Sequence, residues 1–565
     1  MKNWVIGPEN RELAAELSRS LNLSPLLGRI LVKRGLSSPA AAQNFLKPRL
    51  AALRDPFEIP NIEAAARRVL QARDAEEKVT VYGDYDVDGV TGTTILVQTL
   101  TQLGIETDYY IPHRYGEGYS LSPESVRKIA AAGTRLIVTV DCGISSAAEV
   151  KLAGELGLDV IVTDHHNLPD QLPPAVAIVN PKQIAGAHPS RDLSGAGVAF
   201  KFAWALFRLA GIKENTFLTS LLDLAALGTI SDVVPLVDEN RILAVSGLEL
   251  IDQRRRLGLK QLAEAAALSG KISVNKIYFG LAPRLNAAGR LEHASKSVEL
   301  LLADDPHKAG ELAREISRIN SRRQEIGGSI RDEVFLSLDE RSAADSKLIF
   351  LSGDNWHPGV IGIVASQVVD RFFRPTVMIG VNDGVGRGSA RSIEGLNIFS
   401  LLNACRDLFI DFGGHEGAAG FEIETAKIPE LKRRLLAEVD KQVDPADLVP
   451  KLEIDAEVAP AEISLGLVKE LEQLAPHGEG NPAPVFIVKG LSLTDYKKVG
   501  KDGKHFKAWF SKDGVNLEAI GFGLGGLAEQ MDHSAAYDVA VNLETNEWNG
   551  FESVQLSLID VRRAE

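Results

Sequence analysis

The chain has 565 residues, and its 62 Lys and Arg against 76 Asp and Glu give a formal net charge of −14. At roughly 150 residues per domain, this length predicts three or four domains. The acidic balance by itself argues against a nucleic-acid binder, since such proteins usually carry a basic surface. Net charge is a weak guide, because it ignores where the charges lie and which of them bind metal ions.

The composition excludes several other classes of protein. Hydrophobic residues make up 45% and charged residues 24% of the sequence, which is typical of a globular protein and not of a disordered one. No apolar run approaches the roughly 20 residues of a membrane helix, and the first residues lack the layout of a signal peptide. Two cysteines exclude a disulfide framework and a cysteine-based zinc site. We therefore expect a cytoplasmic protein with no membrane partner.

The predicted elements change character along the chain. Residues 1–75 carry apolar residues at three- and four-residue spacing, which predicts helices. From about residue 78, short β-branched runs alternate with helical stretches, which indicates a parallel sheet covered on both faces. Residues 195–330 are predicted to be mainly helical, and a second α/β pattern runs from about 346 to 440. The tail over 451–562 is rich in strands and fits a small barrel such as an OB-fold.

Acidic side chains follow three of the predicted strands, and another acid follows a helix. Ligands bind a parallel sheet beyond the carboxyl ends of its strands, so we expect these side chains to meet there. Crowded carboxylates repel one another and are costly to desolvate unless a cation is present. The side chains concerned are Asp84, Asp86 and Asp88 in VYGDYDVDG, Asp141 in VTVDCG, Asp164, His165 and His166 in VTDHHN, and Asp232 in SDVVP.

These ligand types predict the metal. Carboxylate oxygens with one or two imidazoles suit Mg²⁺ or Mn²⁺. Two such ions about 3.5–4 Å apart can activate water and hold both sides of a phosphoryl displacement.

Each motif alone has a simpler explanation. The DxDxDG segment could be a calcium loop, Asp141 could cap a helix, and Asp232 could cap a turn. Adjacent histidines such as His165 and His166 are unremarkable by themselves. Their combination at strand ends of one sheet favours a metal site.

The order of these motifs resembles that of the DHH phosphoesterase family, which is named for the triplet at residues 164–166. LSGAGVAF (193–200) and GLAPRLNAAGRLEHA (280–294) are typical of its single-strand exonuclease branch. WHPGVIGIVASQV (356–368), GSARSIEG (388–395) and FGGHEGAAGF (412–421) resemble the DHH-associated domain. The resemblance covers essentially the whole chain. One departure is Tyr82, where many relatives carry His.

The resemblance implies an α/β fold of three parts: a DHH-type parallel-sheet catalytic domain, a second α/β DHH-associated domain and a C-terminal OB-like β-barrel. We place a helical region at 1–75, the catalytic domain at 76–300, a connecting helix at 301–345, the associated domain at 346–445 and the barrel at 451–565.

The resemblance also implies an activity, a metal-dependent 5′→3′ exonuclease that hydrolyses single-stranded DNA to 5′-mononucleotides in DNA repair and recombination. Two divalent cations, Mn²⁺ or Mg²⁺, are expected, with Asp141 as the bridging ligand and His166 against the scissile phosphate. The expected partners are single-stranded DNA, a single-strand-binding protein and a helicase, and the expected state is a monomer. The implied metal ligands are Asp84, Asp86, Asp88, Asp141, His165 and Asp232.

An exonuclease must also recognise the end of a strand. A terminal phosphate suits guanidinium groups, hydroxyls and backbone N–H groups. We expect a phosphate pocket that faces the metals across an interdomain cleft. Taken singly, each arginine could form a surface salt bridge and each glycine-rich tract could be a turn. The candidates are Arg114, Arg290, Ser389, Arg391, Gly413, Gly414 and His415.

Part of the C-terminal region is basic, although the chain as a whole is acidic. Residues 485–512 contain seven Lys and two Asp, with four aromatic residues between them. Basic groups that follow phosphates, together with aromatic faces that stack on bases, are typical of single-strand binding. The alternative is a barrel core with a lysine-rich hairpin. The predicted contacts are Lys497, Lys498, Lys504 and Trp509.

Two other functions are compatible with the same fold. A DHH phosphodiesterase of short oligonucleotides or cyclic dinucleotides usually ends after the two catalytic domains, so the basic barrel argues against it. A non-catalytic DNA-binding scaffold would be expected to lose metal ligands, and this sequence lacks none of them.

Overall fold

The computed structural model describes residues 2–118, 120–212, 216–338, 343, 345–548 and 550–564. The chain forms two compact units. One unit comprises residues 1–3, 290–292 and 317–452, and the other comprises residues 4–289, 293–316 and 453–565. Within the described ranges, no helix has both the length and the apolar character that crossing a membrane requires.

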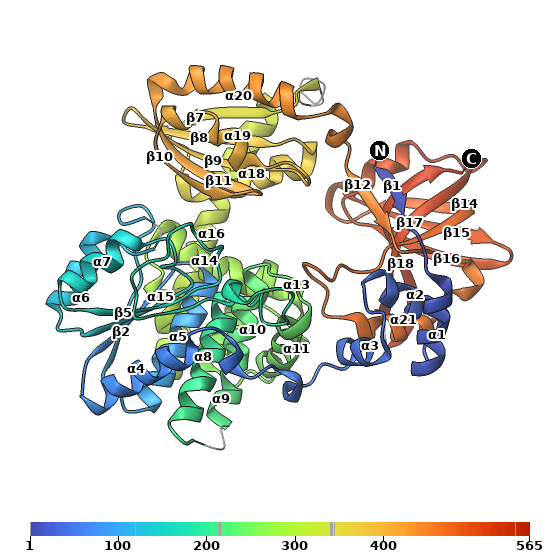
Figure 1. Cartoon of the computed structure of the whole chain (residues 1–565). Coiled ribbons are helices and arrows are strands. Elements are labelled where there is room, and N and C mark those ends of the chain that lie inside the picture. Colours follow the sequence, from blue (N-terminus) through green and yellow to red (C-terminus); the bar gives the residue numbers. More distant parts are fainter. Residues whose placement is uncertain are drawn as a thin grey trace. The chain divides into compact units, whose positions relative to one another are not determined.

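The larger unit contains a five-stranded parallel sheet in the order β3-β2-β4-β5-β6 (Figure 1). Every residue of β2 and β4 is buried, as expected for a sheet covered on both faces. The sequences of these two strands are therefore continuous β-branched runs rather than alternations of apolar and polar residues. The strands are β2 (Val79–Gly83), β3 (Thr107–Tyr110), β4 (Leu136–Val140), β5 (Asp159–Thr163) and β6 (Ala177–Val179).

Helices cover the two faces of this sheet with separate hydrophobic clusters. On one face, α4 (Ile62–Asp74), α5 (Val87–Gln102) and α8 (Gly195–Leu209) pack against the strands. On the other face, α6 (Pro123–Ala131) and α7 (Ala147–Glu155) pack against the side chains that point the opposite way. This arrangement leaves the carboxyl ends of the strands as the place for polar side chains.

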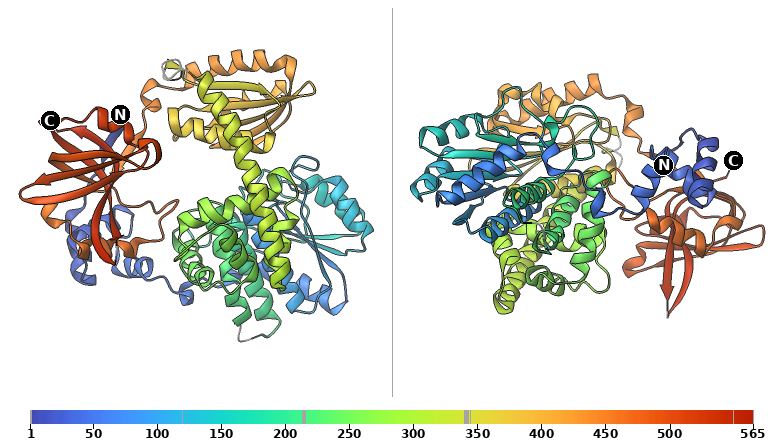
Figure 2. Two further views of the ribbon diagram at one scale, coloured as in Figure 1. Left: turned by 180° about the vertical axis from the view of Figure 1, so that it is seen from behind. Right: turned by 60° about the horizontal axis from the view of Figure 1, so that its bottom comes forward.

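Further helices follow α8 in the chain. Helix α10 (Leu222–Ser231) is buried along its length and packs between α5 and α11 (Asp238–Asp252). Figure 2 shows the longest helix, α16 (Pro306–Ser337), as one continuous element. The remaining helices are α9 (Thr216–Ser220), α12 (Leu257–Ala265), α13 (Val274–Lys276), α14 (Ala282–Leu291) and α15 (Ser295–Leu302).

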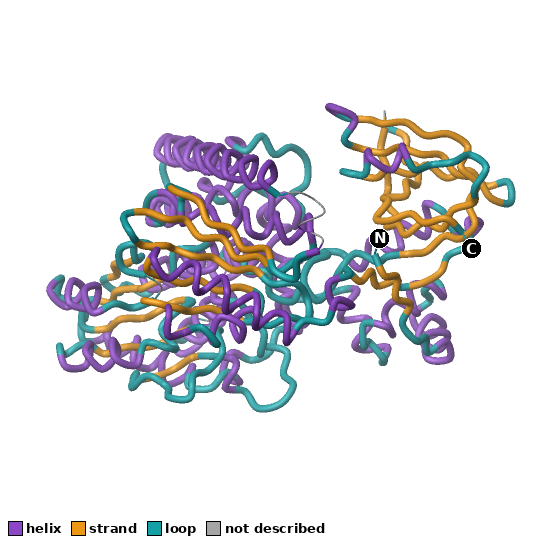
Figure 3. Tube along the Cα trace, turned by 90° about the horizontal axis from the view of Figure 1, so that it is seen from above, coloured by secondary structure: helices purple, strands orange, loops and turns teal. Residues whose placement is uncertain are grey.

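The tail of the larger unit forms a closed barrel in the order β13-β14-β15-β16-β18-β17, with an additional β14–β17 pairing (Figure 3). This confirms the predicted OB-like barrel. The strands are β13 (Ala456–Glu457), β14 (Phe486–Val499), β15 (His505–Lys512), β16 (Val515–Gly521), β17 (Ala536–Trp548) and β18 (Phe551–Arg563), and the short helix α21 (Leu465–Leu471) precedes β14.

The N-terminal helices pack on this barrel. Helices α1 (Arg11–Leu21), α2 (Pro25–Lys33) and α3 (Pro39–Leu46) share one hydrophobic cluster with the barrel strands. In addition, β1 (Asn3–Ile6) pairs with β12 (Lys451–Ile454). Neither contact is visible in local sequence patterns, because both join segments that are hundreds of residues apart.

The smaller unit contains a mixed five-stranded sheet in the order β10-β11-β9-β8-β7. Only β7 (Ile349–Asp354) and β8 (Thr376–Asn382) are parallel, and α18 (Pro358–Phe372) connects them. The antiparallel strands are β9 (Val385–Arg391), β10 (Phe409–His415) and β11 (Ala418–Glu424). Helices α19 (Ile398–Asn403) and α20 (Ile428–Gln442) cover one face and α18 covers the other, which confirms a second α/β domain.

Candidate active site

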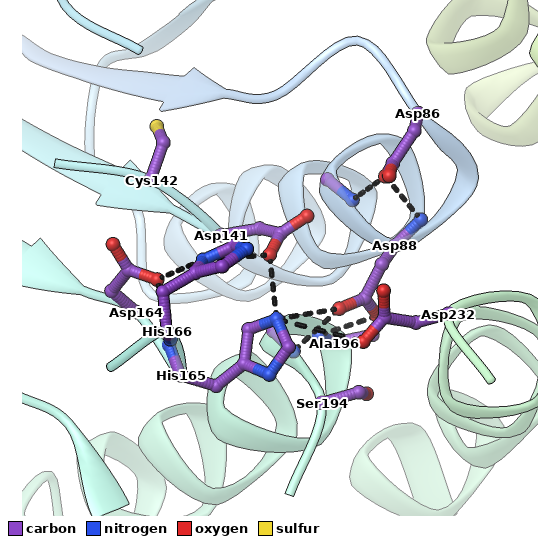
Figure 4. A network of polar contacts seen from close by, with 12 residues as sticks. Asp86, Asp88, Asp141, Cys142, Asp164, His165, His166, Ser194, Ala196 and Asp232 are labelled. Carbon is purple, nitrogen blue, oxygen red and sulfur yellow. Dashed lines mark hydrogen bonds and ion pairs between the residues drawn. The ribbon is translucent and has the colours of Figure 1, made fainter. Parts of the chain in front are cut away.

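The acidic and imidazole side chains predicted from the sequence converge at one edge of the parallel sheet, and Figure 4 labels all of them except Asp84. Asp84 follows β2, Asp141 follows β4, and the triplet at residues 164–166 follows β5. Because β2, β4 and β5 are adjacent and parallel, their carboxyl ends meet. Asp232 comes from the C-terminal end of α10.

Their ligand atoms are close enough to hold metal ions. The Nε2 atom of His165 lies 3.0 Å from Asp141 Oδ1 and 3.5 Å from Asp232 Oδ2. Asp141 and His165 each belong to two groups of three residues whose ligand atoms all lie within 4.8 Å of one another. The groups are Asp141, His165 and His166; Asp88, His165 and Asp232; and Asp84, Asp86 and Asp141.

The electrostatics of the cluster indicate that it is built for cations. Burial, with the neighbouring charges of Asp88 and Asp86, raises the pKa of Asp141 well above its usual range. Burial and the nearby Asp88 and Asp86 charges likewise raise the pKa of Asp232 to about 10. Among the described residues, no group hydrogen-bonds to the buried Oδ1 atom of Asp84. Crowded carboxylates of this kind fit divalent cations, which supply the missing positive charge.

The DxDxDG segment is shaped by backbone hydrogen bonds. The Oδ1 atom of Asp86 accepts the backbone N–H groups of Asp88 at 2.9 Å and Gly89 at 3.1 Å, so Asp86 caps α5. A Cβ atom at Gly89 would lie 2.5 Å from the backbone oxygen of Asp84, so the turn requires glycine there. The glycine of the motif therefore lets the start of α5 approach the backbone of Asp84 closely.

A second helix start holds Asp88. Its two carboxylate oxygens accept the backbone N–H groups of Gly195 at 2.5 Å and Ala196 at 3.0 Å, at the N-terminus of α8. A Cβ atom at Gly195 would lie 2.6 Å from the Cβ atom of Asp141. The SGAG sequence around residue 195 is thus the feature of the sequence that indicates the close approach of α8 to Asp141. The spacing of the acids alone does not indicate it.

Asp164 differs from the other acids, because it belongs to none of the three ligand groups. Its Oδ1 atom accepts the backbone N–H groups of His165 at 2.7 Å and His166 at 3.1 Å, and lies 2.7 Å from Nδ1 of His166. Its Oδ2 atom accepts the backbone N–H of Ile144 at 3.0 Å. Burial lowers the pKa of His166, but the hydrogen bond and the charge of Asp164 outweigh burial and raise it. Asp164 therefore orients His166.

Two residues at the ends of the strands have features of backbone or packing that the sequence does not explain. Asp141 has a φ of 61°, a conformation that costs free energy for a residue other than glycine and is common at functional sites. Tyr82, the departure from the family pattern, is fully buried, donates a hydrogen bond to Ser120 O at 2.7 Å and stacks on Tyr110 with ring centroids 5.4 Å apart. Tyr82 thus has a packing role in the core.

The predicted phosphate ligands of the smaller unit gather beside α18. Arg290 donates to Gly359 O at 3.2 Å in the first turn of this helix. Arg391 donates to Ser389 Oγ at 3.0 Å, and a Cβ atom at Gly362 would lie 2.8 Å from both side chains. Two guanidinium groups and a hydroxyl therefore lie along the start of one helix.

The glycine-rich hairpin belongs to the same sheet. In the strand register, His415 pairs with Ala418, which pairs with Arg391, and Gly413 pairs with Gly420, which pairs with Ser389. Gly414 has a φ of 149° and approaches Ala418 and Ala419 closely.

Arg114 belongs to the larger unit, where its guanidinium lies 4.6 Å above the centre of the Tyr85 ring. It is therefore next to the DxDxDG segment, since Tyr85 stands between its first two acids.

In the barrel, Trp509 lies between two lysines. The Nζ atoms of Lys497 and Lys507 are 5.3 Å and 5.2 Å from its ring, and these lysines are opposite each other on β14 and β15. Lys498 forms an ion pair with Glu529 at 2.8 Å, and Lys504 is exposed. Lys507 is absent from the predicted contacts, although the alternation of β15 places it on the same face as Trp509.

Comparisons with known proteins agree with this geometry. Three family models match: the DHH family N-terminal domain over 78–229, the DHHA1 domain over 345–444 and the RecJ OB domain over 454–560. The single-stranded-DNA-specific exonuclease RecJ of Bacillus subtilis is 40% identical over 100% of this chain and 71% of its own length. The protein of the same name from Haemophilus influenzae is 36% identical over 96% of this chain and 97% of its own length.

Solved structures extend the likeness to three dimensions. The crystal structure of RecJ from Thermus thermophilus in complex with Mn²⁺ has a TM-score of 0.86 at 32% identity and covers 100% of this chain and 80% of that chain. The Mg²⁺ complex has a TM-score of 0.79 at 30% identity, with coverage of 100% and 79%. The chain belongs to the RecJ family of DHH phosphoesterases, the single-stranded-DNA-specific exonucleases.

Proposed function

We propose that this chain is a metal-dependent exonuclease that degrades single-stranded DNA from its 5′ end to 5′-mononucleotides in DNA repair and recombination. The observation that carries the proposal is the convergence of carboxylates and imidazoles at the ends of β2, β4 and β5, in a chain that belongs to the RecJ family. The direction of degradation and the role in repair rest on this family membership.

The metal site is proposed to take two divalent cations, Mn²⁺ or Mg²⁺. Relatives have been solved with each of these ions, and the buried oxygen of Asp84 and the crowded carboxylates fit them. When bound, such ions activate water for attack on the phosphate and stabilise the charge on the leaving oxygen. Asp141 and His165 belong to two ligand groups each, and only the carboxylate of Asp141 has two oxygens to share between two ions, so Asp141 is the proposed bridge. The proposed ligands are Asp84, Asp86, Asp88, Asp141, His165 and Asp232.

His166 is proposed to act on the substrate directly. Asp164 occupies its Nδ1 edge, so Nε2 is the atom that can donate a hydrogen bond to an oxygen of the scissile phosphate. The raised pKa of His166 favours the protonated ring, which is the form that donates and that carries positive charge towards a phosphate. Its side chain is 46% exposed, so substrate can reach it.

Recognition of the strand end is proposed for the groups beside α18. Two guanidinium groups, a hydroxyl and a helix start suit a terminal phosphate. Arg114, beside the DxDxDG segment, is proposed to bind a phosphate of the same end. The proposed phosphate ligands are Arg114, Arg290, Ser389, Arg391, Gly413, Gly414 and His415.

The barrel is proposed to hold the rest of the strand. The ring of Trp509 offers a face for base stacking, and the lysines beside it attract the backbone without reading sequence. The proposed contacts are Lys497, Lys498, Lys504 and Trp509. Family membership also supports the proposal that the protein is a cytoplasmic monomer that works with a single-strand-binding protein and a helicase. It supports in addition the five domain ranges predicted from the sequence.

The substrate class is tested by product release from a panel of substrates in Mn²⁺. We expect 5′-mononucleotides from single-stranded DNA, with much slower release from duplex DNA and from cyclic dinucleotides. Faster turnover of a cyclic dinucleotide would favour a small-substrate phosphodiesterase, and binding of single strands without any hydrolysis would favour a scaffold. The complete ligand set and the barrel argue against both of these alternatives.

A further inference from the structure

Helix α14 contacts the DxDxDG segment at a position that is not part of the metal cluster. The Oδ1 atom of Asn286 accepts the backbone N–H of Val87 at 3.1 Å. Val87 stands between Asp86 and Asp88 and is the first residue of α5. The first N–H groups of a helix have no partner within the helix. Asp86 accepts the next two, from Asp88 and Gly89, so Asn286 completes the capping of this turn.

The same helix approaches the segment at a second point. A Cβ atom at Gly289 would lie 2.8 Å from the backbone oxygen of Tyr85. Residues three apart in a helix share one face, so Asn286 and Gly289 present a single surface to the segment. Tyr85 and Val87 are the two residues that separate the three acids. Helix α14 therefore holds the backbone between the proposed ligands through these two residues.

We propose that Asn286 is a positioning residue for the metal centre, which sets the spacing of Asp84, Asp86 and Asp88 through the backbone of Val87. This inference rests on the proposed metal site. Groups that orient metal ligands from outside the coordination shell typically contribute 10–100-fold to metal affinity. The side chain is suited to this position, because its carbonyl oxygen accepts the hydrogen bond from the N–H group of Val87.

The experiment is a titration of the full chain with Mn²⁺. Calorimetry measures the Kd, and the electron paramagnetic resonance spectrum reports the environment of the bound ion. We expect Asn286→Ala to raise the Kd for Mn²⁺ by about 10-fold or more and to change the spectrum. Asn286→Asp keeps an oxygen acceptor and is expected to stay within about threefold of wild type. The matched control is Asn275→Ala, an exposed asparagine on α13, which is expected to bind as wild type does.

Two further measurements separate positioning from general destabilisation. The melting temperature without metal is expected to fall by only a few degrees in Asn286→Ala, which leaves the buried N–H group of Val87 without its acceptor, so Mn²⁺ binding is measured at a temperature where every variant is folded. Gly289→Ala, which must displace the Tyr85 carbonyl, is expected to weaken Mn²⁺ binding without removing any polar group. It keeps the proposal testable should Asn286→Ala not fold.

The outcomes are distinct for this inference and for the proposed function. Wild-type affinity in both Asn286→Ala and Gly289→Ala would overturn the positioning role and leave the metal site intact. Asn286→Asp binding as weakly as Asn286→Ala would also overturn it, because the acceptor would then not be what matters. Failure of the wild-type chain to bind Mn²⁺ would overturn the proposed metal centre and this inference together.

Discussion

Nδ1 of His166 lies 2.7 Å from Oδ1 of Asp164, and the same oxygen accepts the backbone N–H groups of both histidines of the motif. One buried carboxylate thus fixes the ring orientation of His166 and the turn that carries it. Asp164 acts within the protein, and the other acids of the cluster face the proposed cations. The motif therefore combines a carboxylate that positions with one imidazole proposed to bind metal and one proposed to act on the substrate.

Replacement of His166 by alanine tests the last of these roles. Because His166 is proposed to donate a hydrogen bond to the scissile phosphate and not to bind metal, His166→Ala is expected to lower turnover by about 10²–10³-fold. The Kd for Mn²⁺, measured by titration, should stay within a few-fold of wild type. His307→Ala, an exposed histidine on α16, serves as the control. Unchanged turnover in His166→Ala would reject the role.

The state of the 5′ end is predicted to control the rate. A strand with a 5′-phosphate should be degraded faster than the same strand with a 5′-hydroxyl, since only the former engages the guanidinium groups beside α18. Arg391→Ala should remove most of this difference. We expect the rate on the 5′-phosphate strand to fall by about tenfold or more, because a charge-assisted hydrogen bond is lost. The control is Arg387→Ala, on the same strand but paired with Glu422 at 2.8 Å. Equal rates on both ends, with a neutral Arg391→Ala, would contradict the phosphate site.

The barrel makes a separate prediction about affinity. Trp509→Ala should raise the Kd for single-stranded DNA by roughly 5–150-fold, which corresponds to about 1–3 kcal/mol for base stacking. Lys497→Ala should reduce the slope of log affinity against log salt by about 0.7, the value for one contact to a single strand. Fluorescence titrations at several salt concentrations measure both. Lys432→Ala, an exposed lysine on α20, should change neither quantity. Wild-type affinity in Trp509→Ala would show that this face does not bind bases.

Arg241 is predicted to be a structural residue. It is 2% exposed and donates to the backbone oxygens of Phe45, Gln473, Leu474 and Ala475, so one side chain joins three segments of the larger unit. Arg241→Met would leave these oxygens without a donor, at about 1–3 kcal/mol for each of the two in buried hydrogen bonds, those of Phe45 and Leu474.

We expect the melting temperature of Arg241→Met to fall by at least roughly 5 °C, with Mn²⁺ affinity unchanged. Arg255→Met, at an exposed position, should melt as wild type does. An unaltered melting temperature in Arg241→Met would contradict the role.

The sequence predicts much of this site because hydrophobic strand patterns locate the strand ends. Asp84, Asp141 and His165 follow continuous apolar runs, and parallel strands bring such positions together. The alternation of apolar and basic residues similarly locates Trp509 on a barrel strand.

Contacts that depend on tertiary packing are not predictable in this way. The hydrogen bond from Val87 to Asn286 joins residues 199 positions apart, and nothing in the local pattern of α14 distinguishes that asparagine. The pairing of Lys498 with Glu529 is likewise set by the barrel closure. The sequence alone would place Arg241 on the surface, because charged residues on helices are usually exposed, whereas the structure buries it.

The most direct measurement follows both ends of one labelled single strand in Mn²⁺. We predict that wild type releases the 5′ label as a mononucleotide before the 3′ label, that excess chelator stops the release, and that added Mn²⁺ restores it. Asp141→Asn should reduce the rate by about 10²-fold or more, and Asp170→Asn, an exposed control, should not. Continued release in chelator, earlier loss of the 3′ label, or wild-type rates in Asp141→Asn would contradict a metal-dependent 5′→3′ exonuclease.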